Sequence, residues 1–202
     1  MEHVMTAKEF FKNLKVSLNK QEGLKSLYHD NTKWTVFIKG ITEEMIGGNN
    51  ISREYYRIDS LKYQYTDFYQ SYNEKNHREY FDDKHYLSAY NWKNVYVIEY
   101  ENDSRNWTDE LVKLAHIRSE LKVIIAYSEW GEGKEFYFNL IAKKMKFAVK
   151  LLQACQQESI NDNWLIVFGP CGLQGKKDYD KDIAGYFVGY EIVKGEFVEI
   201  IE

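Results

Sequence analysis

The sequence predicts an α/β protein in which a central sheet is flanked by helices and the chain ends in a β-hairpin. Residues 95–100 are largely apolar on both faces, which is typical of a strand covered on both sides of a sheet. Residues 121–127 form a second largely apolar run of strand length, interrupted only by Lys122. Amphipathic helical patterns alternate with these runs, and no linker or internal repeat interrupts the 202 residues. We therefore expect a single domain over residues 1–202.

The first element is a helix that begins after Thr6. Thr6 is followed three residues later by Glu9, the spacing of a capping box, and Phe10, Leu14 and Leu18 form one apolar stripe. The next apolar run, residues 34–38, is short and ambiguous, and we interpret it as a strand.

A second strand is expected over residues 52–61, with Asp59 near its end. Side chains alternate along a strand, so Asp59 would share one face with Tyr55, Arg57 and Leu61. Residues 62–93 form a long tyrosine-rich connection to the 95–100 strand. Its aromatic rings (Tyr63 to Tyr90) could stack on nucleic-acid bases or pack as an ordinary insertion.

The later elements follow clear patterns in the sequence. Helices are predicted from Trp107 and over residues 134–156, and a buried strand over 164–169. The turn at Lys194 and Gly195 predicts the C-terminal hairpin.

Composition narrows the possible functions without deciding among them. The net charge of −4 does not favour a nucleic-acid binder, although a local basic groove would remain compatible with it. Lysines 143, 144, 146 and 150 could meet phosphates or form a solvated helix face. Cys155 and Cys171 lack a CxxC spacing and are expected to be reduced, buried thiols. No signal peptide or membrane-spanning run is visible, so we expect a cytoplasmic protein with no membrane partner.

The strongest indication of chemistry is a pair of carboxylates at the end of the 95–100 strand. Glu99 and Glu101 are spaced i, i+2 and so point to the same side. Like charges there repel and lose solvation unless a cation compensates them. If the Asp59 strand is adjacent, three carboxylates could hold Mg²⁺ or Mn²⁺, with Glu54 in the outer shell. The same residues could instead be solvated strand ends, or ion-pair partners of Arg57 and Lys113.

The order of these segments resembles the PD-(D/E)XK nuclease superfamily, whose restriction-endonuclease-like fold has a core of helix, three strands, helix and strand. The likeness covers residues 6–127, which would form a core with a central mixed sheet. A helix and strands over residues 134–202 would follow this core. It rests on Arg53 to Asp59 and on Val97 to Asn102, together with the flanking elements. The resemblance implies a metal-bridging role for Asp59 and a second ligand role for Glu99. It also implies a further acid on the first helix, for which Glu9 is the nearest match.

One departure from the family pattern concerns its lysine. The family usually places Lys two residues after the second acid, where it orients the attacking water and stabilises developing charge. This chain has Glu101 there, as a minority of restriction enzymes do, and Ile58 replaces the motif proline. Lys113 on the following helix is the best substitute, ahead of Lys62 and Lys93.

Two functions follow as hypotheses. The first is a metal-dependent endonuclease acting on DNA, with Asp59, Glu99, Glu101 and Lys113 as catalytic residues and a homodimer as one expected assembly. The second is a catalytically silent protein of the same fold that binds nucleic acid or a protein partner. An unrelated α/β interaction domain would be favoured if the Asp59 and Glu99 strands were not neighbours.

Overall fold

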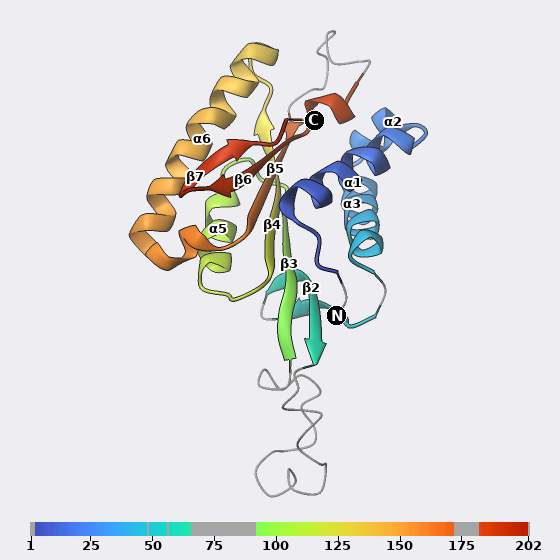
Figure 1. The fold of residues 1–202 in the computed structure, drawn as a ribbon. Coiled ribbons are helices and arrows are strands. Elements are labelled where there is room, and N and C mark those ends of the chain that lie inside the picture. Colours follow the sequence, from blue (N-terminus) through green and yellow to red (C-terminus); the bar gives the residue numbers. More distant parts are fainter. Residues whose placement is uncertain (1–2, 48, 56, 66–91, 172–181, 202) are drawn as a thin grey trace, which may run out of the picture.

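A seven-stranded mixed sheet runs through the part of the chain that the structure describes, a computed structural model covering residues 3–47, 49–55, 57–65, 92–171 and 182–201 (Figure 1). The predicted α/β class is confirmed. The helices are α1 (Ala7–Lys20), α2 (Leu24–Tyr28), α3 (Asn31–Ile46), α5 (Trp107–Ala115), α6 (Lys134–Cys155), η2 (Gln157–Asn161) and η3 (Ala184–Tyr186). The strands are β1 (Ile51–Tyr55), β2 (Ile58–Tyr65), β3 (Trp92–Glu101), β4 (Leu121–Glu129), β5 (Trp164–Cys171), β6 (Val188–Val193) and β7 (Glu196–Glu199).

The strands lie side by side in sequence order, from β1 at one edge to β7 at the other. The pairs β1–β2 and β2–β3 are antiparallel, as are the pairs β5–β6 and β6–β7. The central strands β3, β4 and β5 are parallel, and helices α5 and α6 make the crossovers that parallel strands require. The carboxyl ends of β3, β4 and β5 therefore lie at one end of the sheet.

Helices cover both faces of the sheet, with α1, α2 and α3 on one side and α5 and α6 on the other (Figure 1). The central strands are buried along almost their whole length, as expected for a sheet covered on both faces. In α1 the predicted stripe of Phe10, Leu14 and Leu18 is fully buried. Its capping box is also present, because Thr6 and Glu9 each bond the other's backbone amide.

The expected strand over residues 34–38 is wrong, because this segment lies inside the helix α3. Asp30 caps the helix by accepting a hydrogen bond from the amide of Lys33 at 3.1 Å. Trp34, Ile38 and Thr42, spaced at four residues, are buried along one side. A five-residue apolar window was too short to reveal this period.

The expected single strand over residues 52–61 is two strands. β1 and β2 form an antiparallel hairpin in which Tyr55 faces Ile58. Arg57 has a φ of 63° and Glu54 a φ of 55°, conformations that non-glycine residues adopt rarely. The sequence pattern had predicted that Tyr55 and Asp59 share one strand face. This prediction is wrong, because Tyr55 lies on β1 and is paired with Ile58 of β2.

The later predictions agree closely with the structure. The strand at 121–127, the helix at 134–156 and the strand at 164–169 correspond to β4, α6 and β5. Lys194 and Gly195 have φ of 53° and 82°, as a tight hairpin turn between β6 and β7 requires. Both cysteines are free as expected, although they are half-buried and not fully buried. Most of the tyrosine-rich connection, residues 66–91, lies outside the described residues.

None of the described helices is long and apolar enough to cross a membrane.

Candidate active site

The strands that carry Asp59 and Glu99, β2 and β3, are neighbours in the sheet, as the sequence analysis predicted. Their paired register ends where Ser60 faces Ile98. Beyond that point the amide of Tyr100 donates to the side-chain Oδ2 of Asp59 at 2.9 Å. The Asp59 carboxylate thus lies at the end of the β2–β3 ladder, and is only partly buried there, with a side-chain exposure of 21%.

Three carboxylates lie at this level of the sheet. Extending the register by one residue beyond Ser60 aligns Glu54, Asp59 and Glu99 on the adjacent strands β1, β2 and β3. Glu54 is exposed, whereas Glu99 is 2% exposed. The three side chains therefore form a row that runs from the solvent into the protein.

Lys113 on α5 reaches the buried end of this row, as predicted. Its Nζ lies 2.8 Å from Glu99 Oε1, forms an ion pair with Glu110, and donates to the carbonyl oxygen of Arg57 at 2.8 Å. The Glu99 contact is an ion pair by distance without hydrogen-bond geometry, so Glu99 Oε1 and Glu110 Oε2 are buried acceptors without a hydrogen bond. Burial opposes the charge of the lysine, but the carboxylates of Glu110 and Glu99 outweigh it and raise the pKa of Lys113.

Glu99 is the most perturbed carboxyl group of the site. Burial raises the pKa of Glu99 to about 8, and the nearby charges of Glu110 and Asp59 act in the same direction. The ion pair with Lys113 opposes the shift without cancelling it. A carboxyl group with a pKa near neutrality can take up or release a proton at physiological pH, which is the property of a general acid or base.

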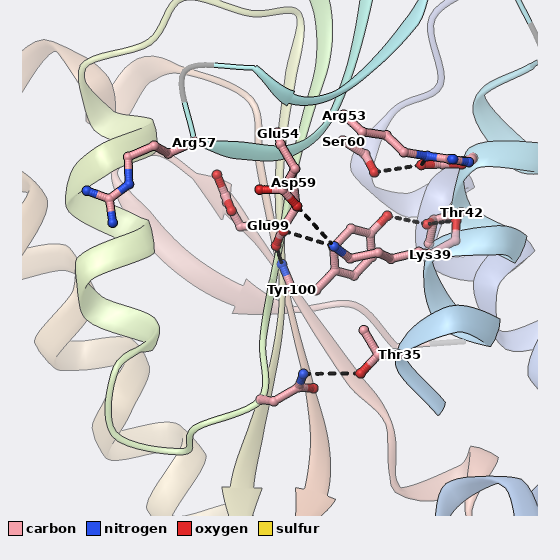
Figure 2. A network of polar contacts seen from close by, with 12 residues as sticks. Thr35, Lys39, Thr42, Arg53, Glu54, Arg57, Asp59, Ser60, Glu99 and Tyr100 are labelled. Atoms are coloured by element: carbon pink, nitrogen blue, oxygen red, sulfur yellow. Dashed lines mark hydrogen bonds and ion pairs between the residues drawn. The ribbon is translucent and has the colours of Figure 1, made fainter. Parts of the chain in front are cut away.

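A second lysine, Lys39 on α3, reaches the other end of the row and was missed by the sequence analysis. Figure 2 shows its side chain directed at Asp59 and Glu54, with Nζ 2.9 Å from Asp59 Oδ1 and 3.7 Å from Glu54 Oε1. The ammonium group also lies 5.3 Å from the centre of the Tyr100 ring, a cation–π contact. Lysines from both helical layers therefore meet the same end of the sheet.

One side of α3 carries a series of polar contacts to β1, β2 and β3 (Figure 2). Besides Lys39, these contacts comprise Thr35 accepting from Asn102 at 3.2 Å, Thr42 with the Tyr100 hydroxyl, and Glu43 with Arg53 and with Ser60 Oγ at 2.9 Å. The pKa of Glu43 is lowered, and the largest cause is its hydrogen bond from Arg53. Residues 35, 39 and 43 repeat at four-residue spacing, so a helical assignment of this segment would have placed them on one face.

The remaining predicted residues are placed as follows. Glu101 follows Glu99 on the same side of β3 and accepts from the Asp103 amide at 2.6 Å, while burial raises the pKa of Glu101. The Arg57 side chain points away from Asp59 (Figure 2). The other sequence candidates have contacts elsewhere: Lys62 with the Ile46 carbonyl, Lys93 with Glu120 at 2.9 Å, and Glu9 in the α1 capping box.

The basic run of α6 divides in two. Lys144 is turned inward, where it donates to the Ser104 carbonyl at 3.1 Å and lies 5.1 Å from the Phe168 ring centre. Lys143, Lys146 and Lys150 are exposed, as a solvated helix face would be.

The donor atoms of the site are carboxylate oxygens, the ligands that Mg²⁺ and Mn²⁺ prefer. The buried Oε1 of Glu99 has no hydrogen bond. The side chain of Asp59 is 21% exposed, so solvent reaches it. These two residues fit a hard divalent cation in chemistry. Within the described ranges, however, no three His, Cys, Asp or Glu side chains are already arranged around a common metal position.

Compared with protein-family models, curated proteins and solved structures, the chain matches none. Its functional interpretation therefore rests on the contacts described above.

Proposed function

We propose that this chain is a divalent-metal-dependent phosphodiester hydrolase that acts on DNA and has a restriction-endonuclease-like core. The observation that carries the proposal is the position of Asp59 and Glu99 on neighbouring strands, at the point where the β2–β3 ladder ends and lysines from two helices converge. Carboxylates beside lysines are the groups that phosphodiester hydrolysis with a metal requires.

The order of elements supports the proposed core. Helix α3, strands β1, β2 and β3, helix α5 and strand β4 follow one another as helix, three strands, helix and strand. This is the order on which the resemblance to PD-(D/E)XK nucleases was based, with two substitutions. The first helix is α3 in place of α1, and the first strand is β1 in place of residues 34–38. Glu9 then lies outside the proposed core.

The proposed roles follow from position. Asp59 and Glu99 would hold the cation, Glu101 would hold it or position water, and Glu54 would act from the outer shell. A bound Mg²⁺ or Mn²⁺ would stabilise charge on the phosphate oxygens and make a coordinated water more acidic. Lys113 keeps Glu99 in place through their 2.8 Å contact.

In the hydrolysis, the oxygen of a water molecule bonds to phosphorus while the bond from phosphorus to the leaving sugar oxygen breaks. Glu101 is the carboxylate best placed to take the proton from the water, because it is partly exposed and its pKa is raised. The leaving oxygen takes its proton from solvent. No oxidant or further reactant is required.

The test is cleavage of supercoiled plasmid DNA in Mg²⁺ or Mn²⁺ by the wild type and by Asp59→Asn and Glu99→Gln. Both variants should lose cleavage while remaining folded. Glu120→Gln is the matched control, because Glu120 is a partly exposed carboxylate that precedes β4, at the opposite end of the parallel strands. Cleavage retained by Asp59→Asn and Glu99→Gln would contradict the proposal.

One observation favours a second candidate, a catalytically silent protein of the same fold that binds nucleic acid or a protein partner. Lys39 and Lys113 already compensate the charges of Asp59 and Glu99. Such pairs can stabilise a fold without any metal. In that case the wild type should neither bind Mn²⁺ nor cleave DNA, and alanine substitutions at Asp59 and Glu99 should only lower stability.

A further inference from the structure

The two lysines of the candidate site differ in how many acceptor atoms lie close to their ammonium groups. The Lys113 ammonium group contacts Glu99, Glu110 and the carbonyl oxygen of Arg57. Only the Arg57 contact has hydrogen-bond geometry, but the two carboxylates also lie within ion-pair distance, so three acceptors surround the ammonium group. Lys113 is therefore held as a fixed bridge between α5 and the strands.

The Lys39 ammonium group is less fully engaged. It donates to Asp59 Oδ1 at 2.9 Å, and its other carboxylate partner, Glu54, is 3.7 Å away and 71% exposed. Lys39 thus has one close acceptor and a second, more distant one on an exposed carboxylate.

We infer that Lys39 is the residue that binds the phosphate undergoing hydrolysis, and that Lys113 is a positioning residue that holds Glu99. This inference rests on the proposed function. When water adds to phosphorus, negative charge grows on the non-bridging oxygens, and an ammonium group hydrogen-bonded to them stabilises that charge. Lys39 can reach them from beside Asp59, whereas Lys113 would first have to leave Glu99 and Glu110.

The two roles predict different defects in cleavage. Lys39→Met should lower kcat about a hundred-fold at saturating Mg²⁺. It should leave the Mn²⁺ dissociation constant within about two-fold of the wild type, because the Tyr100 amide still holds Asp59 in place. Lys113→Met should weaken Mn²⁺ binding about ten-fold, because Glu99 loses its partner, and higher Mg²⁺ should restore most of the cleavage. Lys39→Arg, which keeps a cationic donor, should recover part of the rate.

A binding measurement tests the phosphate contact without catalysis. In an Asp59→Asn background, affinity for a 20-bp DNA duplex is measured against salt concentration in Mg²⁺. Adding Lys39→Met should reduce the slope of log K against log salt by about one, as expected for one lost phosphate contact. Adding Lys113→Met should leave the slope unchanged. Thermal unfolding followed by circular dichroism verifies that each variant is folded. If Lys39→Met is not folded, Lys39→Arg takes its place in the binding measurement.

The outcomes separate this inference from the proposed function. If the wild type cleaves DNA but Lys39→Met cleaves equally well, or only the Lys113→Met defect resists added Mg²⁺, the assignment of Lys39 is wrong and the proposed function stands. If the wild type neither binds Mn²⁺ nor cleaves DNA, both are wrong.

Discussion

The backbone amide of Tyr100 on β3 donates to the side chain of Asp59 on β2 at 2.9 Å, so a carboxylate of the candidate site also joins two strands. Asp59→Ala should therefore lower the free energy of unfolding by about 1–3 kcal/mol, the usual cost of losing a hydrogen bond to a charged group. Asp59→Asn keeps an acceptor and should cost less. Urea unfolding of both variants measures the difference, and equal stability of Asp59→Ala and wild type would show that the bond contributes nothing.

The buried carboxyl group of Glu99 predicts a specific pH dependence of stability. Its pKa is about 8 in the folded protein and near 4.5 when unfolded, so between these values the folded state binds the extra proton. Stability should then fall as pH rises from about 4.5 to 8. Glu99→Gln cannot ionise and should lack this component. Urea unfolding at pH 5, 6.5 and 8 tests this, and parallel pH profiles of the two proteins would contradict it.

A buried lysine far from the candidate site offers a purely structural prediction. Lys122 on β4 is 1% exposed, and its Nζ lies 2.5 Å from Asp162 Oδ2 and 3.2 Å from Ser159 Oγ. Asp162→Ala removes the counter-charge and should destabilise the protein by about 2–3 kcal/mol. Lys122→Met should cost less, because it removes the buried charge itself. Chemical denaturation of the two variants gives the ranking, and the reverse order would contradict this account.

The packing of α1 on the sheet depends on a glycine in β6. A Cβ added at Gly189 would lie 2.7 Å from the nearest ring atom of Phe11. Gly189→Ala should therefore destabilise the protein by about 1–3 kcal/mol. In a Phe11→Leu background, where the side chain at position 11 is smaller, Gly189→Ala should destabilise the protein less. A double-mutant cycle by thermal unfolding tests the contact, and strictly additive effects would mean that the two residues do not meet.

Much of the fold could be predicted from the sequence because its signals are local. Residues 121–127 are apolar apart from Lys122, and the turn at Lys194 and Gly195 has a characteristic composition. Two elements could not be predicted. The 34–38 window was too short to show a helical period, and the turn at Arg57 contains neither glycine nor asparagine to mark it.

These two errors explain what was missed at the candidate site. The proximity of Lys113 to Glu99 could be predicted because its helix directly follows the β3 carboxylates and leads back to the sheet. Lys39 was overlooked because its segment was assigned to the wrong type of element, which hid the face it shares with Thr35 and Glu43. The partnership of Lys39 with Asp59 also depends on how α3 packs on the sheet, and tertiary packing of this kind leaves no local pattern in the sequence.

The most direct test of the proposed metal site is titration calorimetry with Mn²⁺ on the wild type, Asp59→Asn and Glu120→Gln. The account predicts saturable binding to the wild type and to Glu120→Gln, and loss of binding in Asp59→Asn while that variant remains folded. The measurement is repeated with a 20-bp DNA duplex present, because a phosphate can complete the coordination of a cation. Absence of Mn²⁺ binding to the wild type under both conditions would contradict the account.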